Sequence, residues 1–97
     1  MDYKIIVSPK AQIEIEDISE YYSQINFTVL TKFYSELENA YKYLETNPHF
    51  QTRYKNYRAI PIKKFPYLLF FVTDETTKTI KILSCFNTSR SPKKYPK

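Results

Sequence analysis

The hydrophobic residues of this chain change their spacing near residue 54, and this change constrains the fold more than any other feature. Upstream, apolar side chains recur every three or four residues in two stretches, which is the spacing of one face of an α-helix. Downstream, runs rich in β-branched and aromatic residues are separated by short polar breaks, the pattern of β-strands. We therefore expect helices from the first half to pack on a sheet formed largely by the second half.

Two helices are predicted in the first half. Ser8 is a favoured N-cap residue, and the proline after it suits the first helical position. Asn26 or Thr28 can cap the second helix, and Asn47 followed by proline ends it. Because the connection is short, we expect an antiparallel helical hairpin. The two apolar stripes are Ala11, Ile15, Ile18, Tyr22 and Ile25, then Leu30, Phe33, Leu37, Ala40 and Leu44.

Four strands are predicted, with a hairpin turn at 75–78 between the last two. Pro61 and Pro66 lack a backbone N–H, so we expect the second strand to be an edge strand or to bulge at Pro61. The third run is apolar on both faces, which is typical of a central strand. The order β-α-α-β-β-β predicts an α+β fold, a single domain over 1–97 with the helical hairpin on one face of a mainly antiparallel sheet. The strands are expected at 3–7, 57–65, 67–74 and 79–86.

Positive charge is concentrated in the second half of the chain. Residues 1–50 have four lysines against eight acidic residues, a balance of −4, whereas residues 51–97 have eleven lysines and arginines against two acids, a balance of +9. Residues 88–97 form a basic C-terminal tail with one arginine, three lysines and no acid. This asymmetry indicates an anionic partner or, more plainly, a soluble surface, and composition alone leaves both open.

Several functional classes are excluded by what the sequence lacks. Without glycine, the chain cannot form a Gly-rich phosphate loop. Its one histidine, His49, is expected to be an exposed loop residue, and its one cysteine, Cys85, a buried thiol. We therefore expect no metal and no cofactor. With no membrane-length apolar run and no recognisable signal peptide, we expect a cytoplasmic protein with no membrane contact.

The residues with the most chemical potential are basic and aromatic. Arginine can bind phosphate with two parallel hydrogen bonds, lysine supplies a point charge, and tyrosine can stack on a base. On adjacent strands they suit a nucleic-acid surface, but the same residues also suit a well-solvated sheet face. The set comprises Arg53, Tyr54, Lys55, Tyr57, Arg58, Lys63, Lys64, Tyr67, Arg90, Lys93, Lys94 and Tyr95.

Read together, the motifs resemble one known superfamily. A first strand, SPKA opening a striped helix, LETNP closing the second, and YRAIPIKKFPYLLFF leading to SRSPKKYP are similar to the RelE/ParE superfamily of bacterial toxins, closest to its ParE-like members. Arg90 and Pro92 match the superfamily's ending, and Tyr95 stands where tryptophan is frequent. Asn87 stands where histidine is common, and asparagine cannot take up a proton.

The resemblance implies three alternatives. A ParE-like toxin inhibits DNA gyrase by binding it, and this requires no acid–base pair. A RelE-like toxin enters the ribosome and cleaves mRNA without a metal; Arg58 and Arg90 would then hold phosphate, with Tyr95 also catalytic and Tyr67, Lys63 or Lys64 as secondary candidates for proton transfer. The third alternative is an inactive protein that only binds an antitoxin.

The missing histidine favours gyrase inhibition over RNA cleavage. The resemblance also implies a cognate antitoxin whose disordered segment folds over the toxin, with a hetero-oligomer as one form of the complex. The expected target would be gyrase or the ribosome with its mRNA. The residues expected to contact it are Arg58, Lys63, Lys64, Arg90, Lys93 and Lys94.

Overall fold

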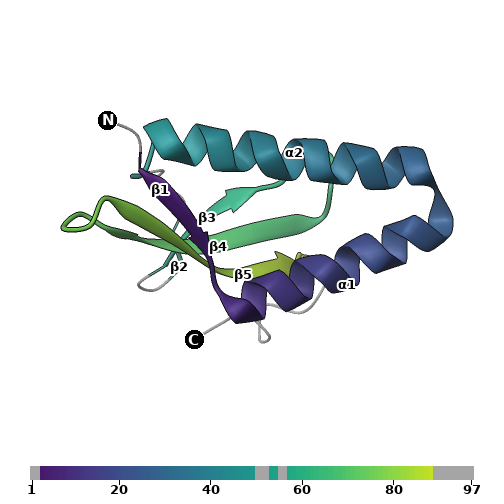
Figure 1. The fold of residues 1–97 in the computed structure, drawn as a ribbon, viewed down its shortest axis with the longest axis horizontal. Helices are drawn as coiled ribbons and strands as arrows, with labels where there is room; N and C mark the ends of the chain where they lie inside the picture. Colours follow the sequence, from purple (N-terminus) through teal and green to yellow (C-terminus); the bar gives the residue numbers. More distant parts are fainter. Residues whose placement is uncertain (1–2, 50–52, 55–56, 89–97) are drawn as a thin grey trace.

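The computed structural model describes residues 3–49, 53–54 and 57–88. Figure 1 shows a helical hairpin lying on one face of a twisted sheet. The α+β class and the order β-α-α-β-β-β are confirmed, with one further two-residue strand that the sequence did not indicate. The elements are β1 (Lys4–Val7), α1 (Pro9–Ile25), α2 (Phe27–Thr46), β2 (Arg53–Tyr54), β3 (Tyr57–Pro61), β4 (Tyr67–Asp74) and β5 (Thr79–Asn87).

The helix ends are capped as the sequence predicts. The Ser8 hydroxyl accepts a hydrogen bond from the N–H of Ala11 at 3.1 Å, and proline follows at the first helical position. Asn26 links the two helices: its N–H caps the end of α1, and its side chain accepts from the N–H of Thr28 at 2.7 Å. Asn47 closes α2. Because one residue serves both ends, the hairpin connection is tight.

The sheet has the strand order β1-β5-β4-β3-β2. The first strand in the chain, β1, lies beside the last, β5. The two pair in parallel, with Lys4 opposite Thr79. The remaining pairs are antiparallel, and β4 lies in the middle, as its apolar faces predict.

The prediction for Pro61 was wrong. The register shift lies in the β4–β5 pair, between Phe70 and Phe71, and β3 is covered by β2 opposite Tyr57 and Arg58. Pro61 is the last residue of β3, beyond the two residues that pair with β2, so its missing N–H removes no ladder bond there.

The core lies between the hairpin and the sheet. Both helical stripes are buried or partly buried except at the hairpin tip, where Ile25 is 57% exposed although it belongs to the stripe. Figure 1 shows the reason, since the tip extends past the end of the sheet. The helices contribute Ala11, Ile15, Ile18, Phe33, Leu37, Ala40 and Leu44, and the sheet side contributes Ile60, Ile62, Tyr67, Leu69, Phe71, Ile80, Ile82 and Cys85.

Phe33 is the centre of an aromatic cluster that joins four segments. Its side chain is fully buried, and its ring centroid lies 5.7 Å from that of Tyr22 on α1. The centroids of Phe65, in the β3–β4 turn, and Tyr67, on β4, lie 5.5 Å and 5.9 Å away. These tilted and edge-on contacts are the favoured arrangements of aromatic rings, so α2 is fixed to both α1 and the sheet.

We expect Phe33→Ala to lower the free energy of unfolding by about 3–5 kcal/mol, because it removes the ring that the other three contact. Phe27→Ala is the matched control on the same helix: Phe27 is 78% exposed, so its truncation should change stability by less than about 0.5 kcal/mol. Urea unfolding followed by circular dichroism measures both. Equal losses in the two variants would contradict this account of the core.

Candidate functional site

Three of the predicted site residues, Lys63, Lys64 and Tyr67, lie at one end of the sheet together with Asn87. The N–H of Thr88, directly after β5, donates a hydrogen bond to the carbonyl of Pro66 at 2.7 Å, so the end of β5 meets the β3–β4 turn. The C-terminal tail therefore begins beside this turn. We call this region the tail-proximal end and define it by Lys63, Lys64, Tyr67 and Asn87.

The lysine pair is the cationic part of the tail-proximal end. Both side chains are exposed, and Lys64 has a φ of 69°, in the left-handed region. This conformation costs a non-glycine residue about 1 kcal/mol, so the turn holds a lysine at a position that would suit glycine better. Within the described ranges 3–49, 53–54 and 57–88, neither lysine forms a salt bridge with a carboxylate. The pair therefore presents its charge to solvent.

Arg58 lies elsewhere. Its Nη1 atom donates to the carbonyl of His49 at 2.8 Å, beyond the end of α2. Arg58 pairs with Phe71 and Asn87 with Tyr67, on opposite sides of β4. With about 3.3 Å per residue and about 4.8 Å between strands, the Cα atoms of Arg58 and Asn87 are about 16 Å apart.

Arg58, one of the two arginines predicted to hold phosphate, thus lies away from the end of β5. The other, Arg90, falls outside the described residues, as do Lys93, Lys94, Tyr95 and Lys55. Phosphate binding by the two arginines therefore stays a prediction. The side chains of Arg53 and Tyr54 also fall outside the description.

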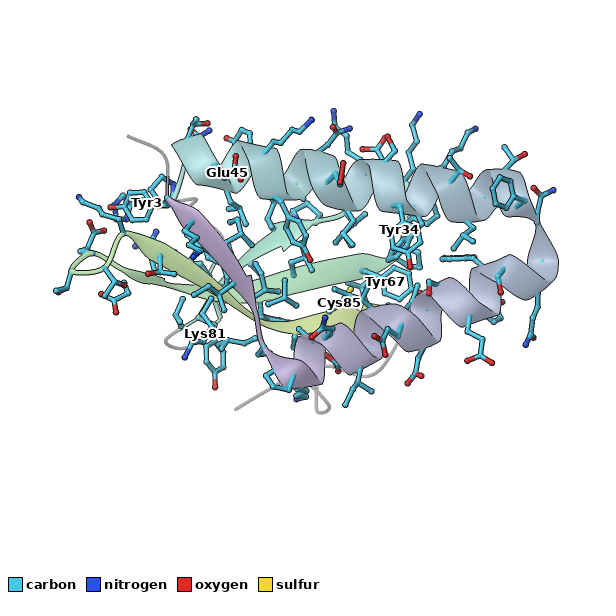
Figure 2. All side chains as sticks on the ribbon, in the orientation of Figure 1. Tyr3, Tyr34, Glu45, Tyr67, Lys81 and Cys85 are labelled. Atoms are coloured by element: carbon cyan, nitrogen blue, oxygen red, sulfur yellow. The ribbon has the colours of Figure 1, made fainter. Side chains whose placement is uncertain are left out.

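Tyr67 is a buried side chain with a weakly acidic hydroxyl. It is 7% exposed and lies between the hairpin and the sheet, close to Cys85 (Figure 2). Burial raises the pKa of Tyr67, and a hydrogen bond with Tyr22 raises it further. A proton acceptor at neutral pH requires the opposite shift, so this environment opposes a role in proton transfer.

His49 lies at the opposite end of the sheet from Asn87. As expected it is exposed, and its Nε2 atom lies 2.7 Å from Oε2 of Glu75 in the β4–β5 turn. Glu75 also accepts a hydrogen bond from the Tyr3 hydroxyl at 2.6 Å. Tyr3 lies at one end of the molecule, away from Tyr67 and Cys85 (Figure 2). From Thr79 to Asn87, β5 is about 26 Å long at about 3.3 Å per residue. The chain's one histidine therefore cannot substitute for the one missing at position 87.

A pocket of about 320 Å³ lies on the helix side of the tail-proximal end, and the sequence did not predict it. Its key residue is Glu14 on α1, whose Oε1 atom accepts hydrogen bonds at 3.0 Å from the Ser84 hydroxyl and from the N–H of Cys85. The carboxylate thus bonds a backbone donor on β5 past the last residue that pairs with β1. The pocket is lined by Glu14, Asp17, Ile18, Tyr67, Cys85, Phe86 and Asn87.

With this pocket, the tail-proximal end is acidic on one side and basic on the other. Glu14 and Asp17 make the side against α1 anionic, which disfavours a phosphate beside Asn87 in this pocket. The turn with Lys63 and Lys64 makes the other side cationic. A sequence signal for the acidic side was present: Glu14 stands three residues after Ala11, on the buried face of the helix, where a carboxylate needs hydrogen-bond donors.

Neither a metal site nor a membrane-spanning helix occurs among the described residues. In that part of the chain, no group of three or more His, Cys, Asp or Glu side chains is placed to hold a metal ion. Neither α1 nor α2, the helices in that same part, has the length and apolar character needed to cross a bilayer.

Comparison with known proteins identifies the family. Residues 5–92 match the family described as "ParE toxin of type II toxin-antitoxin system, parDE". The chain belongs to the ParE toxin family. A solved structure titled "Chromosomal ParDE TA system from P. aeruginosa" contains a chain with the same fold, at a TM-score of 0.70 and 18% identity, covering 88% of this chain and 95% of that one. No curated protein matches the sequence significantly.

We expect Glu14→Ala to lower the free energy of unfolding by about 1–3 kcal/mol, because Ser84 is 1% exposed and would lose its charged hydrogen-bond partner. Glu16→Ala on the same helix, at an exposed position, is the matched control and should change stability by less than about 0.5 kcal/mol. Chemical denaturation at pH 7 distinguishes them. Native stability in Glu14→Ala would show that the carboxylate does not hold α1 to β5.

Stability should fall at high pH because of Cys85. Burial, and secondarily the charge of Glu14, raises the pKa of this thiol from 9.0 to about 12. The native thiol therefore keeps its proton between pH 9 and pH 12, where the unfolded thiol has lost it. In this window the thiol's contribution to the free energy of unfolding falls by about 1.4 kcal/mol per pH unit.

The check compares unfolding of the native chain and of Cys85→Ala at several pH values from 8 to 10.5. The variant loses some packing at every pH but should have a shallower slope above pH 9. Parallel slopes would mean that the thiol ionises in the folded protein as readily as in the unfolded one.

Proposed function

We propose that this protein is a growth-inhibiting toxin that acts by binding DNA gyrase, and that a cognate antitoxin holds it inactive. Membership of the ParE toxin family supports the toxin role. The position of the histidine supports binding over RNA cleavage, because His49 contacts Glu75 at the end of β5 opposite Asn87. Inhibition by binding requires a complementary surface and no proton acceptor.

The cationic side of the tail-proximal end is the surface we assign to the target. Lys63 and Lys64 are exposed beside the point where Thr88 leads into the tail. Arg90, Lys93 and Lys94 follow within six residues of the sequence and lie outside the described part. A gyrase at work holds DNA, so its surroundings are strongly anionic. A basic surface would speed the encounter with such a complex.

The antitoxin follows from the same family membership. The structurally similar chain belongs to a structure titled as a ParDE toxin–antitoxin system. By analogy, we propose that the present chain also has a cognate antitoxin. A basic toxin favours an antitoxin segment with the opposite charge.

A supercoiling assay tests the target. Purified protein added to gyrase and relaxed plasmid should prevent supercoiling and accumulate cleaved DNA. The double variant Lys63→Gln with Lys64→Gln should need about tenfold more protein for the same effect, because it loses electrostatic attraction. Lys4→Gln, at an exposed position of β1 opposite Thr79 and so at the other end of β5 from Asn87, is the control and should act like the native protein.

Two other outcomes would replace the proposal. Undiminished supercoiling at a large excess of toxin, together with cleaved mRNA on translating ribosomes, would make the protein a ribosome-dependent ribonuclease. Unchanged growth when the protein is expressed alone would make it an inactive member that only binds an antitoxin.

A further inference from the structure

The face of the sheet turned away from the helices has a small hydrophobic cluster of its own. Ala59, Phe70 and Phe86 form it, one each from β3, β4 and β5, separate from the core under the helices. The ring of Phe70 lies edge-on to those of Phe86 and Tyr57, with centroids 6.2 Å apart in both pairs. We call this side of the sheet the open face, because both described helices pack on the other side (Figure 1).

The cluster is more deeply buried than an uncovered sheet face allows. Phe70 is 1% exposed and Phe86 is 7% exposed. Side chains stand roughly perpendicular to a sheet, so strand neighbours cover the sides of a ring and leave its outer end accessible to water. Ile6 also points to the open face, because its neighbours Ile5 and Val7 pack on the helix-side core, and it is 43% exposed. The burial of the two phenylalanines therefore requires a cover that the described elements do not supply.

Most of the chain outside the description begins far from this cluster. Residues 1–2 precede β1, which pairs with β5 from Thr79 onwards, and Thr79 is about 23 Å along β5 from Phe86. Residues 50–56 lie in β2 or beside it, and β2 is three strands, or about 14 Å, across the sheet from β5. Neither segment is placed to cover Phe86.

The C-terminal tail, by contrast, begins beside the cluster. Residue 89 is three positions after Phe86, and the hydrogen bond from the N–H of Thr88 to the carbonyl of Pro66 fixes the point where the tail leaves the sheet. Nine residues, 89–97, can extend about 30 Å, whereas crossing from β5 to β3 requires about 10 Å. The tail also has apolar groups suited to such a contact, namely Pro92, Tyr95 and Pro96.

We propose that residues 89–97 fold back across the open face, with Tyr95 packed on Phe70 and Phe86. The tyrosine ring extends a cluster whose members already meet edge-on, an arrangement that aromatic rings favour. The two prolines of the tail restrict its backbone, so less conformational entropy is lost when the tail is ordered.

Burial decides between this position and the acidic pocket on the helix side. Glu14 and Asp17 line that pocket and attract a basic tail by charge. Glu14, however, already accepts two hydrogen bonds from β5, and Asp17 is exposed, so solvent and salt weaken its attraction. A tail in the pocket would also leave Phe70 and Phe86 accessible to water.

A docked tail fixes the face on which its cations lie. Arg90 and the tail lysines are then held on the open face. Arg58 lies on the other face, because its neighbours Tyr57 and Ala59 belong to the open-face cluster and successive side chains of a strand alternate. The sheet thus separates the two arginines predicted to hold phosphate. That the target meets the cations of the open face rests on the proposed function, whereas the packing of the tail does not.

Tyr95→Trp in the full-length protein tests the packing, because the chain has no tryptophan and the indole reports from the tail alone. We expect blue-shifted emission and several-fold weaker quenching by acrylamide than in Phe27→Trp, where the native ring is 78% exposed. Adding Phe86→Ala to Tyr95→Trp should shift the emission to that of Phe27→Trp. The matched control adds Ile6→Ala, on the same face but away from the cluster, and should leave the emission unchanged.

An indole at position 95 that is quenched as strongly as in Phe27→Trp overturns the proposal, because the tail then lies in solvent. Emission that responds to Asp17→Asn or to high salt, but not to Phe86→Ala, also overturns it, because the tail then lies in the acidic pocket. Urea unfolding shows which variants are folded, and Tyr95→Trp alone decides if Phe86→Ala is not. A buried indole together with undiminished supercoiling would refute the proposed function and leave the docked tail in place.

Discussion

The structure depends on the burial of one phenylalanine. Phe33 contacts Tyr22, Phe65 and Tyr67, and through these rings it joins the hairpin, the β3–β4 turn and the central strand. Without this cluster the hairpin would still have its caps, but little would fix the turn against α2. Because Lys63 and Lys64 precede Phe65 directly, the core determines where the exposed cations lie. Core packing and surface chemistry are thus coupled through three consecutive residues.

Charge is separated at two scales. Along the chain, the acidic first half forms the hairpin and the basic second half forms most of the sheet. At the tail-proximal end, the same separation occurs over a few residues, with Glu14 and Asp17 on one side and the lysine pair on the other. A partner that meets this end must match both signs, which makes recognition more selective than net charge alone.

The spacing of apolar residues predicted the helices and strands well, because this spacing shows which face of each element is buried. The caps at Ser8, Asn26 and Asn47 form hydrogen bonds with residues close in sequence, so all three could be predicted. What failed were features set by distant partners. The two-residue β2 has no periodicity to detect, the location of the bulge depends on how β4 and β5 align, and the hydrogen bonds of Glu14 come from residues seventy positions away. Among the predicted site residues, Lys63 and Lys64 lie near the end of β5 and Arg58 lies apart from them, and their role stays a prediction.

The parallel pairing of β1 with β5 has a consequence for how the protein is made. Lys4 pairs with Thr79, so β1 has no neighbour in the sheet until β5, 75 positions later in the chain, has been synthesised. Domains fold as units during synthesis, and contacts between distant residues form late. The sheet therefore closes only after β5 has been synthesised, when both helices are already available to pack on it.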